Sequence, residues 1–388
     1  MQFAKIVGQR NLINTLIDVV LNNRVSHAQL FLGNAGYGGF ALALAYAQFV
    51  SCTDKQVFAS SNKDGLKADS CGKCPSCLKY EKLSHPDLFF TFPNTTTKAV
   101  DKNNESASFL DTFRNYVFSK NAYIDLESWY QELGVENKQG AINVRDANTI
   151  IKNLTLKTYE SQYKINIVWG VDKLQIDAAN KLLKILEEPY ENTLFLLVAE
   201  SSELLLPTIL SRTQLIKLPP ILDEDLAEYL SQENYDNVEE MVRVAEGNLI
   251  KALSYNSDEK QEYRKLFIQF NRLAFSYNNS LSEIYKLVEK ICKMGREELK
   301  VYLNYSLELY RECFQQKELN KQELCNFTEE EKDFKTNFSR FITPRNILNI
   351  YNLTQKSMVE IMRNGNAKMI FLTLAINIGK LIKNTPNK

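Results

Sequence analysis

The sequence carries no excess of charge of either sign and contains few histidines. Its 388 residues include 47 basic and 47 acidic side chains, which makes the formal net charge zero. A chain without an overall positive field can contact nucleic acid only through a local basic patch. We interpret the only two histidines, His27 and His85, as structural residues.

Long apolar runs are also missing. The most apolar late segment, 369–382, is too short to span a bilayer and contains Asn377 and Lys380. The N-terminal sequence MQFAKIVGQR lacks the charged-then-apolar order of a signal peptide. We therefore expect a cytoplasmic protein with no membrane segment. The composition is otherwise that of an ordinary globular chain, and its length suggests two or three domains.

The most informative absence lies in a glycine-rich loop, GNAGYGGF at 33–40. Two of its glycines fit the pattern G-x-x-x-x-G-K-[ST], whose backbone N–H groups cradle phosphates. The next two residues, a glycine and a phenylalanine, replace the lysine that neutralises phosphate charge and the hydroxyl that binds Mg²⁺. The alternative is a plain strand-to-helix turn. We expect a degenerate nucleotide loop made of Gly33, Gly36, Gly38, Gly39 and Phe40.

The acidic pair of an ATPase is missing as well. A working site of this type has Asp-Glu at the end of a buried strand, where the pair holds magnesium and polarises water. The matching strand here ends in IVWGVDKL, so Trp169 and Gly170 stand at those positions, and Asp172 is not followed by an acid. Because two separate sites have lost the chemistry, we expect that this chain does not hydrolyse ATP.

Four of the seven cysteines cluster, namely Cys52, Cys71, Cys74 and Cys77, the last three within CGKCPSC. Four thiolates at roughly 2.3 Å around one ion form a closed tetrahedral zinc site with no open position for a substrate. The spacing therefore predicts a structural zinc ion, with an iron–sulfur cluster or metal-free buried cysteines as alternatives. Nearby lysines could offset the negative charge of the thiolates, namely Lys55, Lys73, Lys79 and Lys82.

Short apolar runs alternate with helical patterns in the first part of the chain, which predicts an α/β domain with a parallel sheet. After Pro219 and Pro220 only helical patterns remain, in a small helical unit and then a helical C-terminal part. The predicted strands are 29–32, 165–170, 193–200 and 213–218, and the predicted helices include 40–50 and 177–189, the latter with Asp177 as N-cap.

The segment from about 93 to 140 begins with polar residues and continues with many aromatic ones. A loop of this length within a compact domain predicts an insertion with some helix of its own. The aromatic residues could stack nucleic-acid bases, but few basic residues accompany them, which favours a self-packed helical pair or a partner contact. They are Phe109, Phe113, Tyr116, Phe118, Tyr123, Trp129 and Tyr130.

Several segments together resemble the clamp-loader subunits of bacterial DNA polymerase III, which are members of the AAA+ superfamily. VGQ at 7–9 is similar to the family's short box near the adenine pocket, and 27–45 is similar to its strand, loop and helix. The cysteine segment and the His-Pro-Asp after it are similar to its zinc module. Residues 180–200 match its N-x-L-L-K-x-L-E-E-P helix and sensor strand, and 206–218 match its Ser-Arg-Cys segment, with Thr213 in place of cysteine.

The resemblance implies an AAA+ α/β core, a small helical lid and an all-helical C-terminal collar that holds the loader together. It is strong over most of the first two parts, weak over the helical C-terminus and absent across the insertion. The implied parts are the AAA+ domain at 1–220, with a zinc module at 52–80 and the insertion at about 93–140, the lid at 221–256 and the collar at 257–388.

The degenerate loop makes the chain most similar to the delta-prime class of these subunits, because the tau/gamma motor class keeps the lysine, the hydroxyl and the acidic pair. Ile250 also stands where motor subunits have an arginine that senses the γ-phosphate. In the resembling subunits, the arginine of the Ser-Arg segment completes the ATP site of a neighbouring subunit. The resemblance assigns this role to Arg212, which follows a predicted short helix, PTIL at 207–210, with Ser211 orienting the turn.

The implied partners are tau/gamma-type and delta-type subunits in a hetero-pentamer, which would load a ring-shaped sliding clamp on primed DNA. The chain would hold structural zinc, bind no ATP productively and lack enzymatic activity of its own. The alternatives are an ATP-hydrolysing tau/gamma-like subunit that uses an unusual loop and a separate zinc protein that binds nucleic acid. The loss of the loop lysine and of the acidic pair counts against the first, and zero net charge counts against the second.

Overall fold

The computed structural model describes residues 1–59, 65–97, 100, 104–135, 140–235, 238–255, 258–319 and 332–383. The chain forms two compact units, which are described separately below. Unit 1 comprises Met1–Asp236 and Ala245–Ile250, and unit 2 comprises Asn237–Val244 and Lys251–Lys388. The predicted division into three parts stays a prediction. No helix in the described ranges combines the length and the apolar character that crossing a membrane requires.

A parallel five-stranded sheet forms the centre of unit 1, and its strand order is β4-β5-β6-β1-β7. The four predicted strands are confirmed, and a fifth, β4, was missed by the sequence pattern. Every residue of β5 and β6 is buried, and most of them are apolar, as expected for strands covered on both faces. The strands are β1 (Ala28–Leu32), β4 (Leu88–Thr91), β5 (Lys164–Trp169), β6 (Thr193–Ala199) and β7 (Gln214–Lys217).

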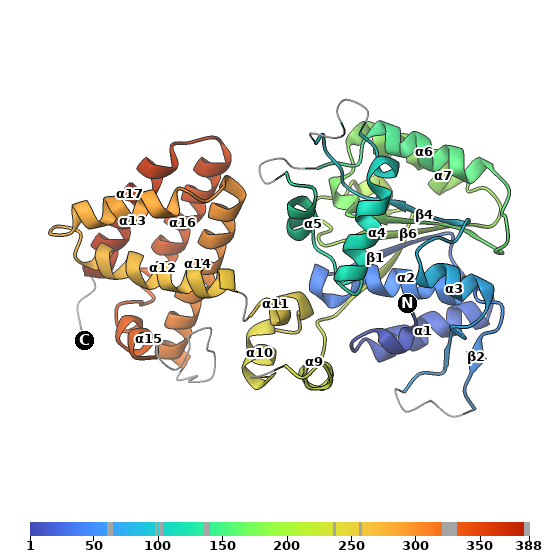
Figure 1. The fold of residues 1–388 in the computed structure, drawn as a ribbon, viewed down its shortest axis with the longest axis horizontal. Helices are drawn as coiled ribbons and strands as arrows, with labels where there is room; N and C mark the ends of the chain where they lie inside the picture. The colour runs from blue at the N-terminus through green and yellow to red at the C-terminus, as the bar shows by residue number, and fades with distance from the viewer. Residues whose placement is uncertain are drawn as a thin grey trace. The chain divides into compact units, whose positions relative to one another are not determined.

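Helices cover both faces of the sheet, so the predicted α/β fold is confirmed (Figure 1). Helices α6 (Val144–Thr155) and α7 (Ile176–Glu187) pack together on one face, and α2 (Gly39–Ser51), which is buried throughout, lies on the other. The predicted N-cap of α7 was wrong, because Gln175 occupies that position and Asp177 lies in the first turn. The other elements up to the insertion are η1 (Phe3–Lys5), α1 (Arg10–Leu21), η2 (Ala35–Tyr37), the paired strands β2 (Gln56–Val57) and β3 (Ala68–Asp69), and α3 (Pro75–Glu81).

The insertion folds into η3 (Ser106–Phe109), α4 (Leu110–Ser119) and α5 (Leu126–Glu132). Most of its aromatic side chains are buried, and the rings of Phe113 and Tyr116 each lie 5.4 Å from the ring of Trp129 within the insertion. Phe113 also stacks on Phe92, just before the insertion, at a centroid distance of 3.9 Å. Self-packing of the insertion is therefore confirmed, and a base-stacking surface is excluded for the rings that are buried. These are Phe109, Phe113, Tyr116, Tyr123 and Trp129, whereas Phe118 is exposed.

The remaining helices of unit 1 are η4 (Val171–Lys173), α8 (Pro207–Leu210) and α9 (Asp223–Gln232). Helix α11 (Leu249–Leu253) begins in unit 1 and ends in unit 2. The described residues of unit 2 are helical, as predicted, and surround one apolar core in which α12 packs on α17 and α14 packs on α16. The helices of unit 2 are α10 (Val238–Ala245), α12 (Asp258–Phe275), α13 (Leu281–Ile291), α14 (Arg296–Leu319), α15 (Lys332–Ser339), α16 (Ile347–Met362) and α17 (Ala367–Lys383).

Candidate functional site

The glycine-rich loop connects β1 to α2, as a phosphate-binding loop does, but two of its backbone N–H groups form hydrogen bonds within the loop itself. The N–H of Tyr37 donates to the carbonyl oxygen of Asn34 at 2.9 Å, and the N–H of Gly38 donates to that of Ala35 at 3.3 Å. Gly38 has a φ of 86°, a left-handed conformation that favours glycine. The loop keeps the shape of a strand-to-helix connection while two of its donors are already bonded.

Side chains from two distant segments of unit 1 cover this loop. A Cβ on Gly36 would lie 1.7 Å from Oδ1 of Asn248, so only glycine permits this approach. The amide of Asn248 also donates to Oδ1 of Asn34 at 2.6 Å. Tyr123, from the insertion, packs against Gly38, where a Cβ would lie 3.0 Å from the tyrosine ring. The protein's own side chains therefore fill the space above the glycines.

Aromatic rings occupy the two positions at which an ATPase binds magnesium. Phe40 and Trp169 are both buried, their ring centroids lie 6.4 Å apart, and Phe113 of the insertion lies 5.8 Å from each of them. Magnesium requires oxygen ligands and keeps several water molecules. An apolar cluster of three rings offers no oxygen ligands. Phe40 and Trp169 are therefore part of the hydrophobic core.

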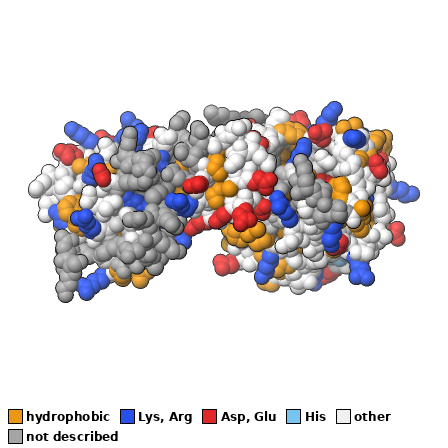
Figure 2. Space-filling model, turned by 90° about the horizontal axis from the view of Figure 1, so that it is seen from below, with side chains coloured by type: hydrophobic (Ala, Val, Ile, Leu, Met, Phe, Trp, Pro, Cys, Tyr) orange, Lys and Arg blue, Asp and Glu red, His pale blue; other side chains and the backbone are white. Residues whose placement is uncertain are grey.

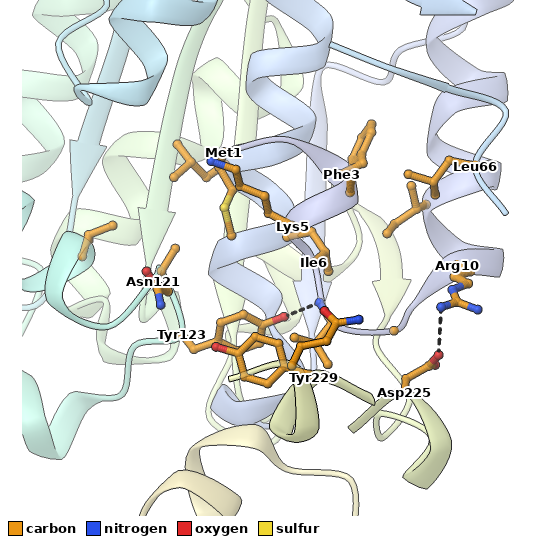
Figure 3. A pocket seen from close by; sticks show the side chains of 18 of the residues that line it. Met1, Phe3, Lys5, Ile6, Arg10, Leu66, Asn121, Tyr123, Asp225 and Tyr229 are labelled. Carbon is orange, nitrogen blue, oxygen red and sulfur yellow. Dashed lines mark hydrogen bonds and ion pairs between the residues drawn. The ribbon is translucent and has the colours of Figure 1, made fainter. Parts of the chain in front are cut away.

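A cavity of about 510 Å³ lies beside the VGQ segment (Figure 3). Val7, Tyr123 and Tyr229 line it, and the ion pair between Arg10 and Asp225, 3.5 Å long, lies at its side. The hydroxyl of Tyr123 accepts a hydrogen bond from the N–H of Val7 at 2.9 Å, and burial raises the pKa of this tyrosine. Tyr123 thus lines the cavity and also contacts the glycine loop, whose residues take no part in the lining.

Arg212 follows the short helix α8, as the sequence predicts, and its side chain is 31% exposed. Its Nη1 donates to Oγ of Ser211 and to the carbonyl oxygen of Thr208, each at 3.0 Å. On the other edge, Nε donates to Oε1 of Glu187 at the end of α7, at 2.6 Å. Thr213, in place of the family's cysteine, donates its hydroxyl to the carbonyl oxygen of Ile209 at 3.1 Å. The guanidinium is therefore oriented by neighbours of its own chain.

The four predicted cysteines come together in one cluster, with all sulfur atoms within 4.8 Å of one another. The distances are 3.7 Å from Cys52 to Cys71, 4.0 Å from Cys52 to Cys74 and 4.0 Å from Cys71 to Cys77. Zn–S bonds of about 2.3 Å in a regular tetrahedron place sulfur atoms about 3.8 Å apart. The cluster therefore has the donor set and the spacing of a closed tetrahedral zinc site.

Backbone N–H groups point at the sulfur atoms, which favours the thiolate form. The N–H of Cys71 donates to Sγ of Cys52 at 3.3 Å, and the N–H of Cys74 donates to Sγ of Cys71 at 3.2 Å. Burial would raise the pKa of Cys74, but N–H groups of Cys77 and Thr53 lower it to about 6, whereas burial raises the pKa of Cys77. Four thiolates this close together need a cation to ionise together.

Of the lysines expected to offset this charge, two have clear positions. The ammonium of Lys55 donates to the carbonyl oxygens of Cys52 and Val50, at 2.8 and 3.2 Å, so its charge lies against the cluster. Lys79 instead pairs with Glu160 at 2.5 Å. Asp69 in β3, two residues before Cys71, accepts the N–H groups of Phe3 and Ala4 at 3.1 and 3.0 Å and so holds the N-terminal segment next to the cysteine loop.

His85 is a structural residue rather than a fifth ligand. Its side chain is fully buried, its Nδ1 accepts the N–H of Asp87 at 3.1 Å, and its Nε2 lies 3.2 Å from Oε1 of Glu160. The ring packs on Tyr80 at a centroid distance of 4.8 Å. Burial lowers the pKa of His85, against the opposite effect of the carboxylates of Glu160 and Asp87.

Acid is expected to destabilise unit 1 through His85. Its pKa is lower in the folded chain than in the unfolded chain, so below about pH 6.5 the unfolded state binds more protons and the free energy of unfolding falls. Each unit of pKa difference corresponds to about 1.4 kcal/mol. Urea unfolding at pH 7.5 and pH 5.5 should show a smaller fall in the free energy of unfolding for His85→Asn than for the wild type, because the variant lacks the imidazole. The cysteines titrate in both proteins and do not contribute to the difference. Equal pH effects would contradict the assignment.

The sequence missed three residues of this site, namely Asn248, Tyr123 and Glu187. Each of them contacts a residue far away in the sequence, and no local sequence pattern predicts such a contact. The Leu-Glu-Glu-Pro match points at Glu187, but it gives no reason for a bond to Arg212.

Comparisons with known proteins agree with the motifs. The family model for "DNA polymerase III, delta subunit" matches residues 8–222, more than half of the chain. The chain is 29% identical over 248 residues to the DNA polymerase III subunit delta' of Haemophilus influenzae, covering 63% of this chain and 59% of that protein. It is 24% identical over 226 residues to the delta' subunit of Bacillus subtilis, covering 58% and 52%.

The tau/gamma subunit of Haemophilus influenzae is also similar, with 26% identity over 260 residues, which cover 65% of this chain and 30% of that subunit. The chain thus spans between 30% and 59% of the length of these three relatives. Both subunit classes are related to it at nearly the same identity, so identity alone does not distinguish them. The parallel sheet with its flanking helices, the four-cysteine cluster and the helical C-terminal region are the features that the sequence motifs predicted. The chain belongs to the DNA polymerase III delta subunit family, whose members are clamp-loader subunits.

Proposed function

We propose that this chain is a delta-prime-type subunit of the clamp loader, without ATPase activity of its own. In this role it supplies Arg212 to the ATP site of a neighbouring subunit, so that the assembled loader closes the sliding clamp on primed DNA. Tau/gamma-type and delta-type subunits are the proposed partners, in a hetero-pentamer. The observation that carries the proposal is the filled nucleotide site, in which Phe40, Trp169 and Tyr123 occupy the space for metal and phosphate.

The energetics of phosphoryl transfer support the absence of turnover. The reaction depends on a lysine and a magnesium ion that neutralise charge on the β- and γ-phosphates. Gly39 offers no cation, and a Cβ there would lie 3.3 Å from Cγ1 of Val198, so Val198 would have to shift by a few tenths of an ångström to admit a larger side chain. An ATPase with an unusual loop would need a substitute cation beside the glycines. The described side chains nearest to Gly33, Gly36, Gly38 and Gly39 carry no positive charge, namely Leu218, Tyr37, Asn248, Tyr123 and Val198.

The position of Arg212 supports its proposed part in catalysis. It directly follows a short helix that is anchored by the buried Ile209, which fixes the backbone, and its guanidinium remains partly exposed at the surface. Arginine presents a rigid fork of N–H donors that matches phosphate oxygens. An arginine held in this way can be offered to a nucleotide on another chain.

For the other parts of the protein we propose structural roles. The cysteine cluster is proposed to hold one structural zinc ion through Cys52, Cys71, Cys74 and Cys77, and the helices of unit 2 are proposed to form the collar of the loader. The proposed divisions are 1–220, 221–256 and 257–388. A separate nucleic-acid-binding role is not favoured, because basic side chains on the face shown in Figure 2 are interspersed with acidic ones and form no continuous stripe.

ATP binding and hydrolysis by the purified chain test this proposal, with zinc quantified on the same sample. We expect one equivalent of zinc and no turnover above the background of a Gly38→Asp variant, which would place a carboxylate in the loop. Robust turnover that this variant abolishes would overturn the proposal in favour of a tau/gamma-like ATPase. The variant changes the chain's own loop, so loss of turnover in it would assign that turnover to this chain and not to a contaminating ATPase.

A further inference from the structure

Arg212 is bound to its own chain on both edges of the guanidinium. Nε donates to Oε1 of Glu187 at 2.6 Å, and Nη2 pairs with the same oxygen. Nη1 is bonded to Thr208 and Ser211. All three nitrogens therefore have acceptors within the chain, and a phosphate from another subunit has to displace one of them.

The carboxylate of Glu187 is the acceptor that a phosphate would displace. Arginine binds carboxylates and phosphates through the same forked edge, so the two anions compete for it. Thr208 offers a backbone carbonyl oxygen and Ser211 a hydroxyl, and both are neutral. The backbone segments that carry Glu187 and Arg212 are held in place relative to each other, because the nearby Leu186 and Ile209 belong to one buried cluster.

We propose that Glu187 is a positioning residue that holds Arg212 on its own subunit and gives it up to a phosphate of the neighbouring subunit's nucleotide. Engagement of Arg212 is then an exchange of carboxylate for phosphate. This inference rests on the role proposed above for Arg212. The side chains of Glu187 and Arg212 are 48% and 31% exposed, and ion pairs with such exposure are weak. A triphosphate carries more charge and more acceptor oxygens, so it wins the exchange.

The exchange has a kinetic signature. The carboxylate competes with the nucleotide only for the free arginine, so it raises the ATP concentration needed for engagement. Once Arg212 is engaged, Glu187 no longer contacts it, and the barrier of the chemical step is unaffected. An effect on KM with no effect on kcat distinguishes this role from a structural one, in which both would worsen.

The test uses Glu187→Gln in the assembled loader, because glutamine keeps the size of the side chain and removes its charge. We expect KM for ATP at the neighbouring site to fall about two- to fivefold, with kcat unchanged. Glu188→Gln is the matched control, since it removes the charge of the adjacent exposed glutamate and should leave both constants unchanged. An unchanged or raised KM in Glu187→Gln, or a lowered kcat, would overturn the exchange.

Arg212→Ala separates this inference from the proposed function. If Arg212→Ala leaves turnover of the loader intact, the proposed function itself fails. If Arg212→Ala abolishes turnover while Glu187→Gln behaves like the wild type, only the exchange fails. In the Arg212→Ala background Glu187→Gln should have no further effect on equilibrium binding of ATP, which is measured because turnover is lost there, since the two residues then no longer interact.

Discussion

Replacing Arg212 by alanine is expected to leave the chain folded and incorporated into the loader, while ATP turnover at the site it serves falls by about 10³- to 10⁵-fold. The loss is large because a guanidinium supplied in trans binds the phosphate of the bound nucleotide and also meets the additional charge that develops in the transition state. The stability cost is small, since the ion pair with Glu187 is exposed and such pairs contribute about 0–1 kcal/mol. DNA-stimulated ATPase of a reconstituted loader is the measurement.

Two companion variants sharpen this result. Arg212→Lys keeps the positive charge but loses the fork, so its turnover should lie between those of the wild type and the alanine variant. Lys217→Ala removes another exposed cation, from the strand that follows, and should leave turnover unchanged. If Arg212→Ala is incorporated and turns over ATP at the wild-type rate, Arg212 has no catalytic part. If Lys217→Ala is equally damaging, general charge rather than the fork is responsible.

Structural features that depend on residues close together in the sequence could be predicted. The β1–loop–α2 connection, the four-cysteine cluster and the short helix before Arg212 each occupy one or two short segments with a strong local pattern. Their chemistry also follows from residue type, because a lost lysine or hydroxyl needs no structure to be noticed. The strand β4 was missed although Leu88–Thr91 is a short apolar run. Such a run is ambiguous by itself, and only pairing with β5 makes it a strand.

Features decided by distant contacts could not be predicted. Helix α7 begins after Gln175 because the N–H of Gln175 donates to the carbonyl oxygen of Ile142 at 3.0 Å, which keeps the chain extended up to that point. Asp177, the predicted N-cap, therefore lies within the first turn of the helix, where its charge still suits the helix dipole. Tyr123 reaches the glycine loop from the insertion, the segment for which no family pattern exists. The loop glycines predict a backbone shape, but not which side chain fills it.

Removing the metal from the cysteine cluster is expected to destabilise unit 1 more than any surface substitution. Without a cation, four sulfur atoms within 4.8 Å cannot all be thiolates, and their packing around a common centre is lost. The loss spreads, because β3 beside the cluster holds the N-terminal segment through Asp69. Zinc present at about 1,000 times its dissociation constant stabilises the fold by about 4 kcal/mol. For a domain of this size that corresponds to a fall of about 10 °C in Tm.

The sequence provides a probe and a matched pair of variants for this measurement. Both tryptophans, Trp129 and Trp169, lie in unit 1, so their fluorescence reports the melting of that unit alone. Cys74→Ser removes a ligand but keeps an N-cap for α3, because serine also caps helices well, whereas Cys292→Ser removes a cysteine of unit 2 that lies outside the cluster. We expect a chelator and Cys74→Ser to lower the Tm of unit 1, and Cys292→Ser to retain one zinc ion per chain and the wild-type Tm. Iron in place of zinc would assign the cluster to iron–sulfur chemistry, and metal-free protein with an unchanged Tm would mean that buried thiols alone hold this part of the fold together.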